Sequence, residues 1–163
     1  LEFRRVLFRS VMGIPESVPD RESQLLPEMI STGLPDIILP VKDEVVLAAI
    51  QPDFPGLTEL SEEYDVVGVH AFTLSALDGR FHVRNFAPRY AINEEAATGT
   101  SNGALTYYLY KNNLLNKGEQ TVFIQGEAMG RPSEVVSFLV ESEKNRIDIG
   151  GRAVTLAKGE IFL

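Results

Sequence analysis

Short apolar runs separated by polar turn residues dominate the chain, and most of these runs are too short to form helices. Their lengths and alternation predict strands over residues 29–31, 37–41, 66–75, 80–86, 121–124, 133–141, 147–149 and 153–156. Asp78-Gly79 is a hairpin signal, and Gly150-Gly151 predicts a further turn. Strands therefore form most of the predicted structure.

Two short helices are predicted between the first strands. Asp43 can cap a helix over residues 44–50, whose apolar positions share one face. Pro52 and Pro55 end that helix, and a second one is predicted over residues 57–64.

The best helical pattern covers residues 98–111. Helical spacing is kept by its apolar residues Ala104, Leu105, Tyr108 and Leu109. Its first turns carry the small residues Gly99, Ser101, Gly103 and Ala104. Small residues allow close packing from several sides, so we expect a sheet to enclose this helix. Few helices and many strands predict the α+β class.

The first 28 residues differ in character from the rest, and this difference predicts how the chain is divided. The first ten residues, LEFRRVLFRS, can be encoded by DNA that resembles a common sequencing adapter read in frame. We therefore expect residues 1–10 to be an artefact that makes no conserved-core contacts and either extends away or packs arbitrarily, with the upstream gene missing. The alternative is a genuine basic amphipathic start. The proline-rich residues 11–28 are predicted to be a linker remnant, and residues 29–163 the folded domain.

Charge and composition exclude several function classes. The net charge is -8, which disfavours nucleic acid as a partner, and the densest basic cluster lies within residues 1–10. The chain has no cysteine and therefore no disulfide, thiolate nucleophile or cysteine-bound zinc. The sequence contains no run of 18 apolar residues, so it predicts no membrane span. A cytoplasmic setting fits this composition.

Residues 93–105 carry the most chemistry. Glu94 and Glu95 precede a helix start that contains Gly99. A helix start offers free N–H groups and positive potential, and glycine lets an anion approach closely. A neighbouring carboxylate could exchange a proton with that anion. Alternatively, the two glutamates only stabilise the helix, by about 0.3–1 kcal/mol each, and Thr98 is only the N-cap.

Three separate motifs resemble the PhzF-like (phenazine biosynthesis-type) isomerase family. They are Ser31–Pro35, then Arg84–Pro88 with Ile92–Gly99 and Asn102-Gly103, and finally Gln125-Gly126 with Met129–Ser133. The resemblance covers residues 12–163. It implies one half of the diaminopimelate epimerase-like fold, with a mixed, strongly curled sheet around a central helix.

The resemblance also implies a function. Family members are isomerases or epimerases that move a proton on a small metabolite without metal or organic cofactor. Their active site lies between two halves, and the principal acid/base is a glutamate of the N-terminal half. We therefore expect this chain to be the C-terminal portion, inactive alone, with a small carboxylate as substrate and a possible homodimer when full length. The alternatives are a non-catalytic metabolite-binding module of the same fold and a purely structural domain.

Individual roles follow from the same resemblance. The resemblance implies that Glu95 is the catalytic residue, at a position where many members carry aspartate. The substrate-binding residues are Thr32, Gly33, Thr98, Gly99, Thr100 and Ser101. Thr98 stands where related epimerases carry a cysteine, and its hydroxyl is too weak an acid for two-cysteine racemase chemistry.

The remaining polar candidates are predicted to be structural. His70 and His82 lie too far apart in the sequence to predict a metal site, so no metal ligand is assigned. Arg131 either binds a carboxylate in a bidentate manner or serves as a turn residue paired with a nearby acid.

Overall fold

The predicted apolar runs become one large sheet and four helices in the computed structural model, which describes residues 2–15, 25–73, 76–142 and 145–162. The helices are α1 (Glu2–Val11), α2 (Glu44–Ala49), α3 (Phe54–Glu63) and α4 (Gly99–Lys111), with short 3-10 turns η1 (Pro88–Tyr90) and η2 (Glu127–Met129). The strands are β1 (Glu28–Ser31), β2 (Pro35–Val41), β3 (Val69–Thr73), β4 (Phe81–Ala87), β5 (Ile92–Glu95), β6 (Gln120–Gln125), β7 (Ser133–Leu139) and β8 (Ile147–Gly151).

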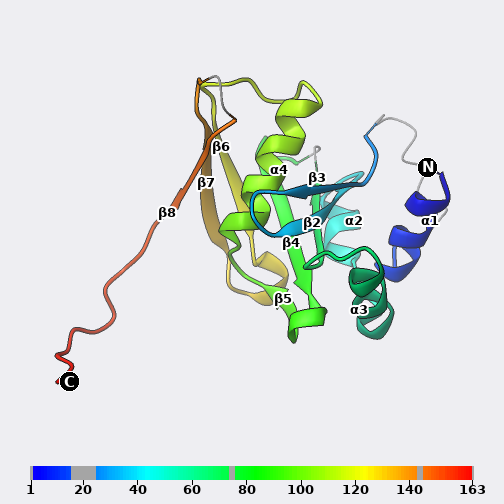
Figure 1. Cartoon of the computed structure of the whole chain (residues 1–163), viewed down its shortest axis with the longest axis horizontal. Coiled ribbons are helices and arrows are strands. Elements are labelled where there is room, and N and C mark those ends of the chain that lie inside the picture. Colours follow the sequence, from blue (N-terminus) through cyan, green and yellow to red (C-terminus); the bar gives the residue numbers. More distant parts are fainter. Residues whose placement is uncertain (1, 16–24, 74–75, 143–144, 163) are drawn as a thin grey trace.

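The sheet is mixed and strongly curled, as predicted (Figure 1). Its strand order is β1-β2-β3-β4-β6-β7-β8, and β5 pairs with β4 outside this path. The pairs β2–β3 and β4–β6 are parallel, and the other pairs are antiparallel. Helix α4 contacts β1 and β2 near one end of the sheet and β7 and β8 at the other. Contacts with both ends require the sheet to wrap around α4.

Each face of the sheet has its own apolar core. On the α4 face, the four predicted core residues Ala104, Leu105, Tyr108 and Leu109 are fully buried. The other face packs against the first three helices, with Leu47 of α2 and Leu57 of α3 among its buried residues. The α+β class and the enclosed helix are therefore confirmed.

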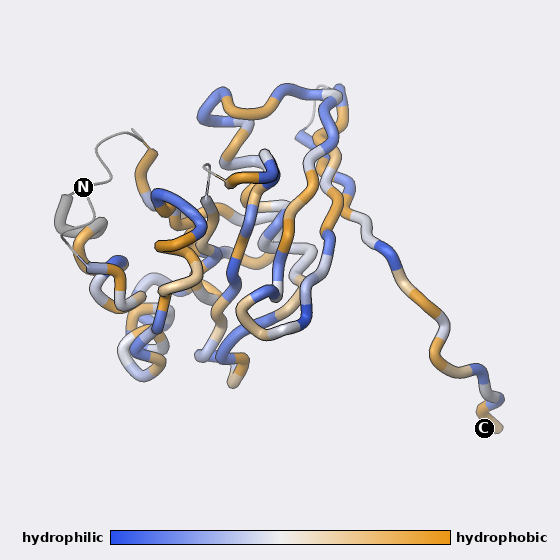
Figure 2. The backbone as a smooth tube through the Cα atoms, turned by 180° about the vertical axis from the view of Figure 1, so that it is seen from behind, coloured by the Kyte–Doolittle hydropathy of each residue, from blue (hydrophilic) through white to orange (hydrophobic). Residues whose placement is uncertain are grey.

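The two ends of the chain differ from the sequence-based expectation. Residues 153–156 are not a strand, because the exposed segment after β8 extends away from the sheet and finds no pairing strand (Figures 1 and 2). At the other end, helix α1 does not extend away from the folded body, which was one of the two expected arrangements of residues 1–10. Phe8 is 4% exposed, and its ring lies edge-on to Tyr64 at 5.5 Å, because α1 turns an apolar face inward.

The predicted boundaries at residues 10 and 28 stay predictions, as does the origin of the first ten residues. Met12 and Ile14 are nevertheless buried in the same core as Phe8, and Leu25 packs against the core around α4. The described parts of the predicted linker thus belong to the folded body. Residues 16–24 lie outside the described residues.

Within the described residues, no helix has both the length and the apolar character needed to cross a membrane.

Candidate active site at the start of the central helix

The carboxylate of Glu95 is held at the start of α4. Strand β5 pairs with β4 and ends at Glu95, directly before the turn that leads into α4. Thr98 occupies the N-cap position, but its side chain does not cap the helix. Instead, the Thr98 hydroxyl donates a 2.9 Å hydrogen bond to Oε2 of Glu95. The hydroxyl therefore orients the Glu95 carboxylate, instead of accepting a hydrogen bond from a backbone N–H group of the helix.

Gln125, at the end of β6, holds both Thr98 and Glu95 in place through hydrogen bonds. Its Nε2 donates to the Thr98 hydroxyl at 2.9 Å and to the Glu95 carbonyl at 2.7 Å. Its Oε1 accepts from the backbone N–H of Thr98 at 3.2 Å and from Nδ2 of Asn102 at 2.9 Å. Gln125 is fully buried, so these bonds satisfy an amide that water cannot reach.

His70 extends the same network into the protein interior. Its Nε2 lies 3.2 Å from Oδ1 of Asn102, whose Nδ2 already donates to Gln125. Its Nδ1 lies 3.0 Å from Oδ1 of Asn85, so an amide oxygen faces each ring nitrogen. Burial lowers the pKa of His70 to about 4, although the hydrogen bonds to Asn102 and Asn85 oppose this shift. The prediction that His70 is structural fits these contacts.

Glu95 lines a cavity of about 300 Å³ beside the helix start. Three other predicted site residues line the same cavity: Thr98, Thr100 and Ser101. The remaining polar lining comes from Asp36, Asn85 and Tyr90, and the apolar lining includes Leu34, Val67 and Ile92. A cavity of this size accommodates a small metabolite.

Asp36 is a site residue that the sequence reasoning missed. It lies in β2, is 1% exposed, and its Oδ2 accepts a 2.6 Å hydrogen bond from the Ser101 hydroxyl. Its Oδ1 is buried without a well-formed hydrogen bond. Burial raises the pKa of Asp36 to about 6; the hydrogen bonds of Ser101 and Gly68 oppose this shift, and the charge of Glu95 adds to it. The signal in the sequence that could have pointed to Asp36 is a charged residue directly next to the apolar run at residues 37–41.

The other predicted binding residues lie in or near a second cavity. Thr32, Gly99 and Thr100 line this space of about 340 Å³, so Thr100 belongs to both cavities. The Thr32 hydroxyl donates to the Thr100 carbonyl at 3.0 Å. Gly33 lines neither cavity, and its N–H donates to the Ser31 hydroxyl at 3.1 Å.

Glu94 and Glu95 have different partners, although they are adjacent. Glu94 forms a bidentate pair with Arg84, in which both hydrogen bonds are 2.8 Å long. Arg84 also donates to the Leu47 and Ile50 carbonyls at the end of α2. Glu94 therefore fits the structural alternative, whereas Glu95 faces a cavity.

The comparisons with known proteins assign the family. The family described as phenazine biosynthesis-like protein (PhzC-PhzF) matches residues 10–159, and the chain belongs to it. An uncharacterized isomerase of Deinococcus radiodurans is 35% identical over 136 residues, which are 79% of this chain and 43% of that protein. The trans-2,3-dihydro-3-hydroxyanthranilate isomerase of Pseudomonas chlororaphis is 28% identical, with 84% of this chain and 45% of that protein covered.

Solved structures agree on the fold. A PhzF family protein from Enterococcus faecalis matches with a TM-score of 0.63 at 26% identity, covering 96% of this chain and 51% of that one. The Bacillus anthracis PhzF family protein matches with a TM-score of 0.70 at 20% identity, covering 87% and 49%. The chain therefore has a PhzF-type fold. It spans about half the length of the curated relatives that it matches.

Proposed function

We propose that this chain forms one wall of the active site of an isomerase that moves a proton on a small carboxylate-bearing metabolite, with Glu95 as a proton-transfer residue. The observation that carries the proposal is the position of Glu95, which Thr98 holds at a cavity of about 300 Å³. The isomerase names of the relatives support the reaction class.

The hydrogen bonds around Glu95 suit proton transfer. Thr98 donates to Oε2, which leaves Oε1 as the atom that can take a proton from the substrate or return it. The Thr98 hydroxyl is itself held by Gln125, so the carboxylate keeps one orientation without help from the substrate. A fixed acid beside a cavity loses less entropy when it reacts.

The start of α4 supplies a subsite for the substrate carboxylate. Gly99, Thr100 and Ser101 are the first three residues of a 13-residue helix, whose N-terminal N–H groups and dipole attract an anion. Thr100 lines both cavities, so an anion near its N–H would lie close to Glu95. On this proposal, the carboxylate of a small substrate would lie at the helix start and its reacting carbon would face Glu95.

The second acid of the reaction would come from elsewhere. The curated relatives are about twice as long as the part that this chain matches, and the family resemblance implies a facing glutamate in the other half. On this proposal, the chain alone binds the substrate weakly and does not turn it over. Joining it to such a half completes the site.

The test uses this chain joined to the remaining half of a relative, such as the Deinococcus radiodurans isomerase. The substrate to try first is trans-2,3-dihydro-3-hydroxyanthranilate, after which the Pseudomonas chlororaphis relative is named. The reaction runs in D₂O, and mass spectrometry detects deuterium in the product. We expect Glu95→Gln to lower kcat by about 10²–10⁴-fold with little change in KM.

Two further variants separate chemistry from binding. Glu94→Gln is the matched control, because Glu94 is paired with Arg84, and it should keep kcat. Gly99→Val should raise KM, because a branched side chain would cover the anion subsite. Wild-type kcat in Glu95→Gln would contradict the proposal. Substrate binding without turnover by the joined protein would instead favour the non-catalytic binding module.

A further inference from the structure

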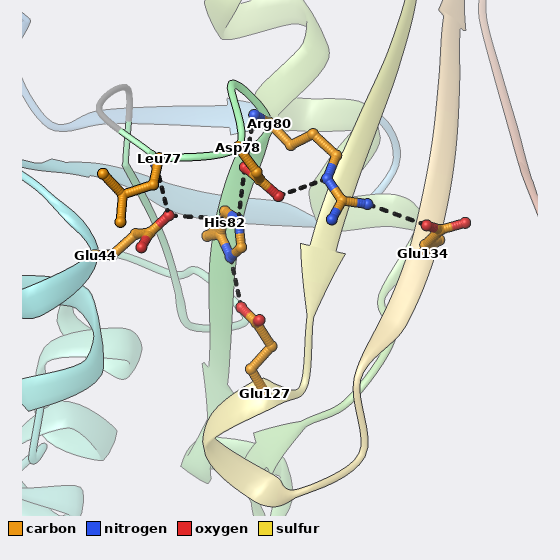
Figure 3. A network of polar contacts seen from close by, with 7 residues as sticks. All are labelled: Glu44, Leu77, Asp78, Arg80, His82, Glu127 and Glu134. Atoms are coloured by element: carbon orange, nitrogen blue, oxygen red, sulfur yellow. Dashed lines mark hydrogen bonds and ion pairs between the residues drawn. The ribbon is translucent and has the colours of Figure 1, made fainter.

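A second polar cluster lies on the sheet face opposite the candidate active site. His82 and Arg84 of β4 point toward α2, as the hydrogen bond from Arg84 to the Leu47 carbonyl shows. Asn85 points to the other face, where it meets His70 and lines the candidate site. The cluster around His82, which Figure 3 shows, therefore lies on the face opposite Glu95.

Three segments far apart in the sequence bring ligand-type atoms together at His82. Glu44 comes from the first turn of α2, Asp78 from the loop between β3 and β4, and His82 from β4 itself. Nε2 of His82 lies 3.1 Å from Oδ1 of Asp78 and 3.6 Å from Oε1 of Glu44. All three atoms lie within 4.8 Å of one another. Among the described residues, this is the one such group of three.

These separations are close to those of a coordinated cation. Imidazole nitrogen and carboxylate oxygen bind Zn²⁺ at about 2.0–2.2 Å, so two ligand atoms of a tetrahedral site lie about 3.4 Å apart. The two distances from His82 already bracket that value. The ligand oxygens of Glu44 and Asp78 lie within 4.8 Å of each other, and Glu44 is a long, partly exposed side chain that can adjust this separation.

A third carboxylate orients the imidazole ring. Nδ1 of His82 lies 2.5 Å from Oε2 of Glu127 in η2. Nδ1 can donate to Glu127 while Nε2 donates to Asp78, and a cation bound at this point would replace the proton on Nε2. Metal-binding histidines usually have such a carboxylate behind the ring, because it fixes the tautomer and makes the ligand nitrogen more basic.

A neighbouring cavity provides the open side that such a site needs. Its volume is about 320 Å³, and its lining includes Glu44, His82 and Glu127 together with Arg84. Water molecules in this cavity could complete the coordination sphere. The cavity is an observation independent of the distances between the ligand atoms.

The ligands are also held in place before a cation arrives. The backbone N–H of Leu77 donates to Oε1 of Glu44 at 3.1 Å. Arg80 donates from its backbone N–H to Oδ1 of Asp78 at 2.9 Å, and its Nε donates to Oδ2 at 2.6 Å. Figure 3 shows these bonds around the ring of His82. One bound cation would therefore tie the β3–β4 loop to α2.

We propose that Glu44, Asp78 and His82 bind one divalent cation of the zinc type, with Glu127 positioning the histidine. The donor set, one imidazole with two carboxylates, suits Zn²⁺ better than Mg²⁺ or Ca²⁺, which prefer oxygen ligands alone. The site is structural, because it joins a loop to a helix on the face away from Glu95. It does not depend on the proposed isomerase activity.

The experiment titrates the whole chain with Zn²⁺ and records the imidazole nitrogen signals of ¹⁵N-labelled protein by NMR. The chain contains two histidines, and the variant His82→Asn assigns their signals. We expect one equivalent of Zn²⁺ to shift Nε2 of His82 and to leave the signals of buried His70 unchanged. Isothermal titration calorimetry should show 1:1 binding that excess Mg²⁺ does not displace.

The variants then distinguish a built site from scattered surface binding. Glu44→Gln and His82→Asn should each weaken Zn²⁺ binding at least 100-fold, and Glu127→Gln about 10–100-fold. Glu134→Gln is the matched control, because Glu134 contacts Arg80 but offers no ligand to the cluster, and its affinity should equal that of the wild type. Equal affinity in wild type, Glu44→Gln and His82→Asn would overturn the proposal. So would an unshifted Nε2 signal of His82, which would leave the cluster as an ion pair only.

Discussion

Asp36 should make the stability of this chain depend on pH in an unusual direction. Its pKa is raised from 3.8 to about 6 in the folded protein, because the carboxyl is buried beside Glu95. The folded chain therefore binds this proton more tightly than the unfolded chain does. The stabilisation is fully present below about pH 4 and is lost as the pH rises through about 6. A shift of about two units corresponds to roughly 3 kcal/mol.

The variant Asp36→Asn isolates this contribution. Asparagine keeps an oxygen that can accept the hydrogen bond from Ser101 but has no charge to bury. We expect the free energy of unfolding of the variant, relative to wild type, to rise by about 2–3 kcal/mol between pH 4 and pH 7. Urea unfolding followed by circular dichroism at several pH values measures this difference, since the chain has no tryptophan to serve as a fluorescent probe.

Ser101→Ala provides a second, opposite test of the same reasoning. The Ser101 hydroxyl stabilises the charged carboxylate, so its removal should raise the pKa of Asp36 further and enlarge the loss of stability at neutral pH. NMR of the Asp36 carboxyl carbon reads the pKa directly. A difference between wild type and Asp36→Asn that stays constant from pH 4 to pH 7 would refute the argument.

Two further predictions concern packing, and urea unfolding measures both. Gly68→Ala should destabilise the chain by roughly 3 kcal/mol or more, because the added methyl would lie 1.8 Å from the Phe86 carbonyl oxygen. Gly150→Ala is its control and should change stability by less than about 0.5 kcal/mol, since nothing lies within 4 Å of the added atom. Phe8→Ala should cost about 3 kcal/mol, because Phe8 is buried against Tyr64. An unchanged stability would show that the buried ring of Phe8 contributes nothing to the core and would favour arbitrary packing of the first ten residues.

Local patterns predicted the elements whose side chains repeat at a regular spacing. The central helix was predicted because apolar residues recur every three to four positions from Ala104 to Leu109, and all of them are buried. The hairpin signal at Asp78-Gly79 likewise lies between β3 and β4. The same reasoning failed for residues 153–156, because alternation predicts a strand only where a partner strand is available.

The candidate site could be predicted only in part. The sequence pointed to Glu95 and to the start of the helix, because these residues lie within one short segment whose chemistry is local. It did not reveal that Glu94 forms an ion pair with Arg84 while Glu95 faces a cavity. That distinction depends on how β4 and β5 pair.

The sequence by itself determined the fold class and the helix on which the site is built, since both depend on spacing along the chain, and its motifs resembled those of the family. Only the tertiary structure brought Asp36 to Ser101, Gln125 to Thr98 and Glu44 to His82. Each of these pairs joins residues from different elements, and the curling of the sheet decides which of them meet. Burial then changes their chemistry, as in the raised pKa of Asp36, because desolvation exists only once the chain has closed around the group.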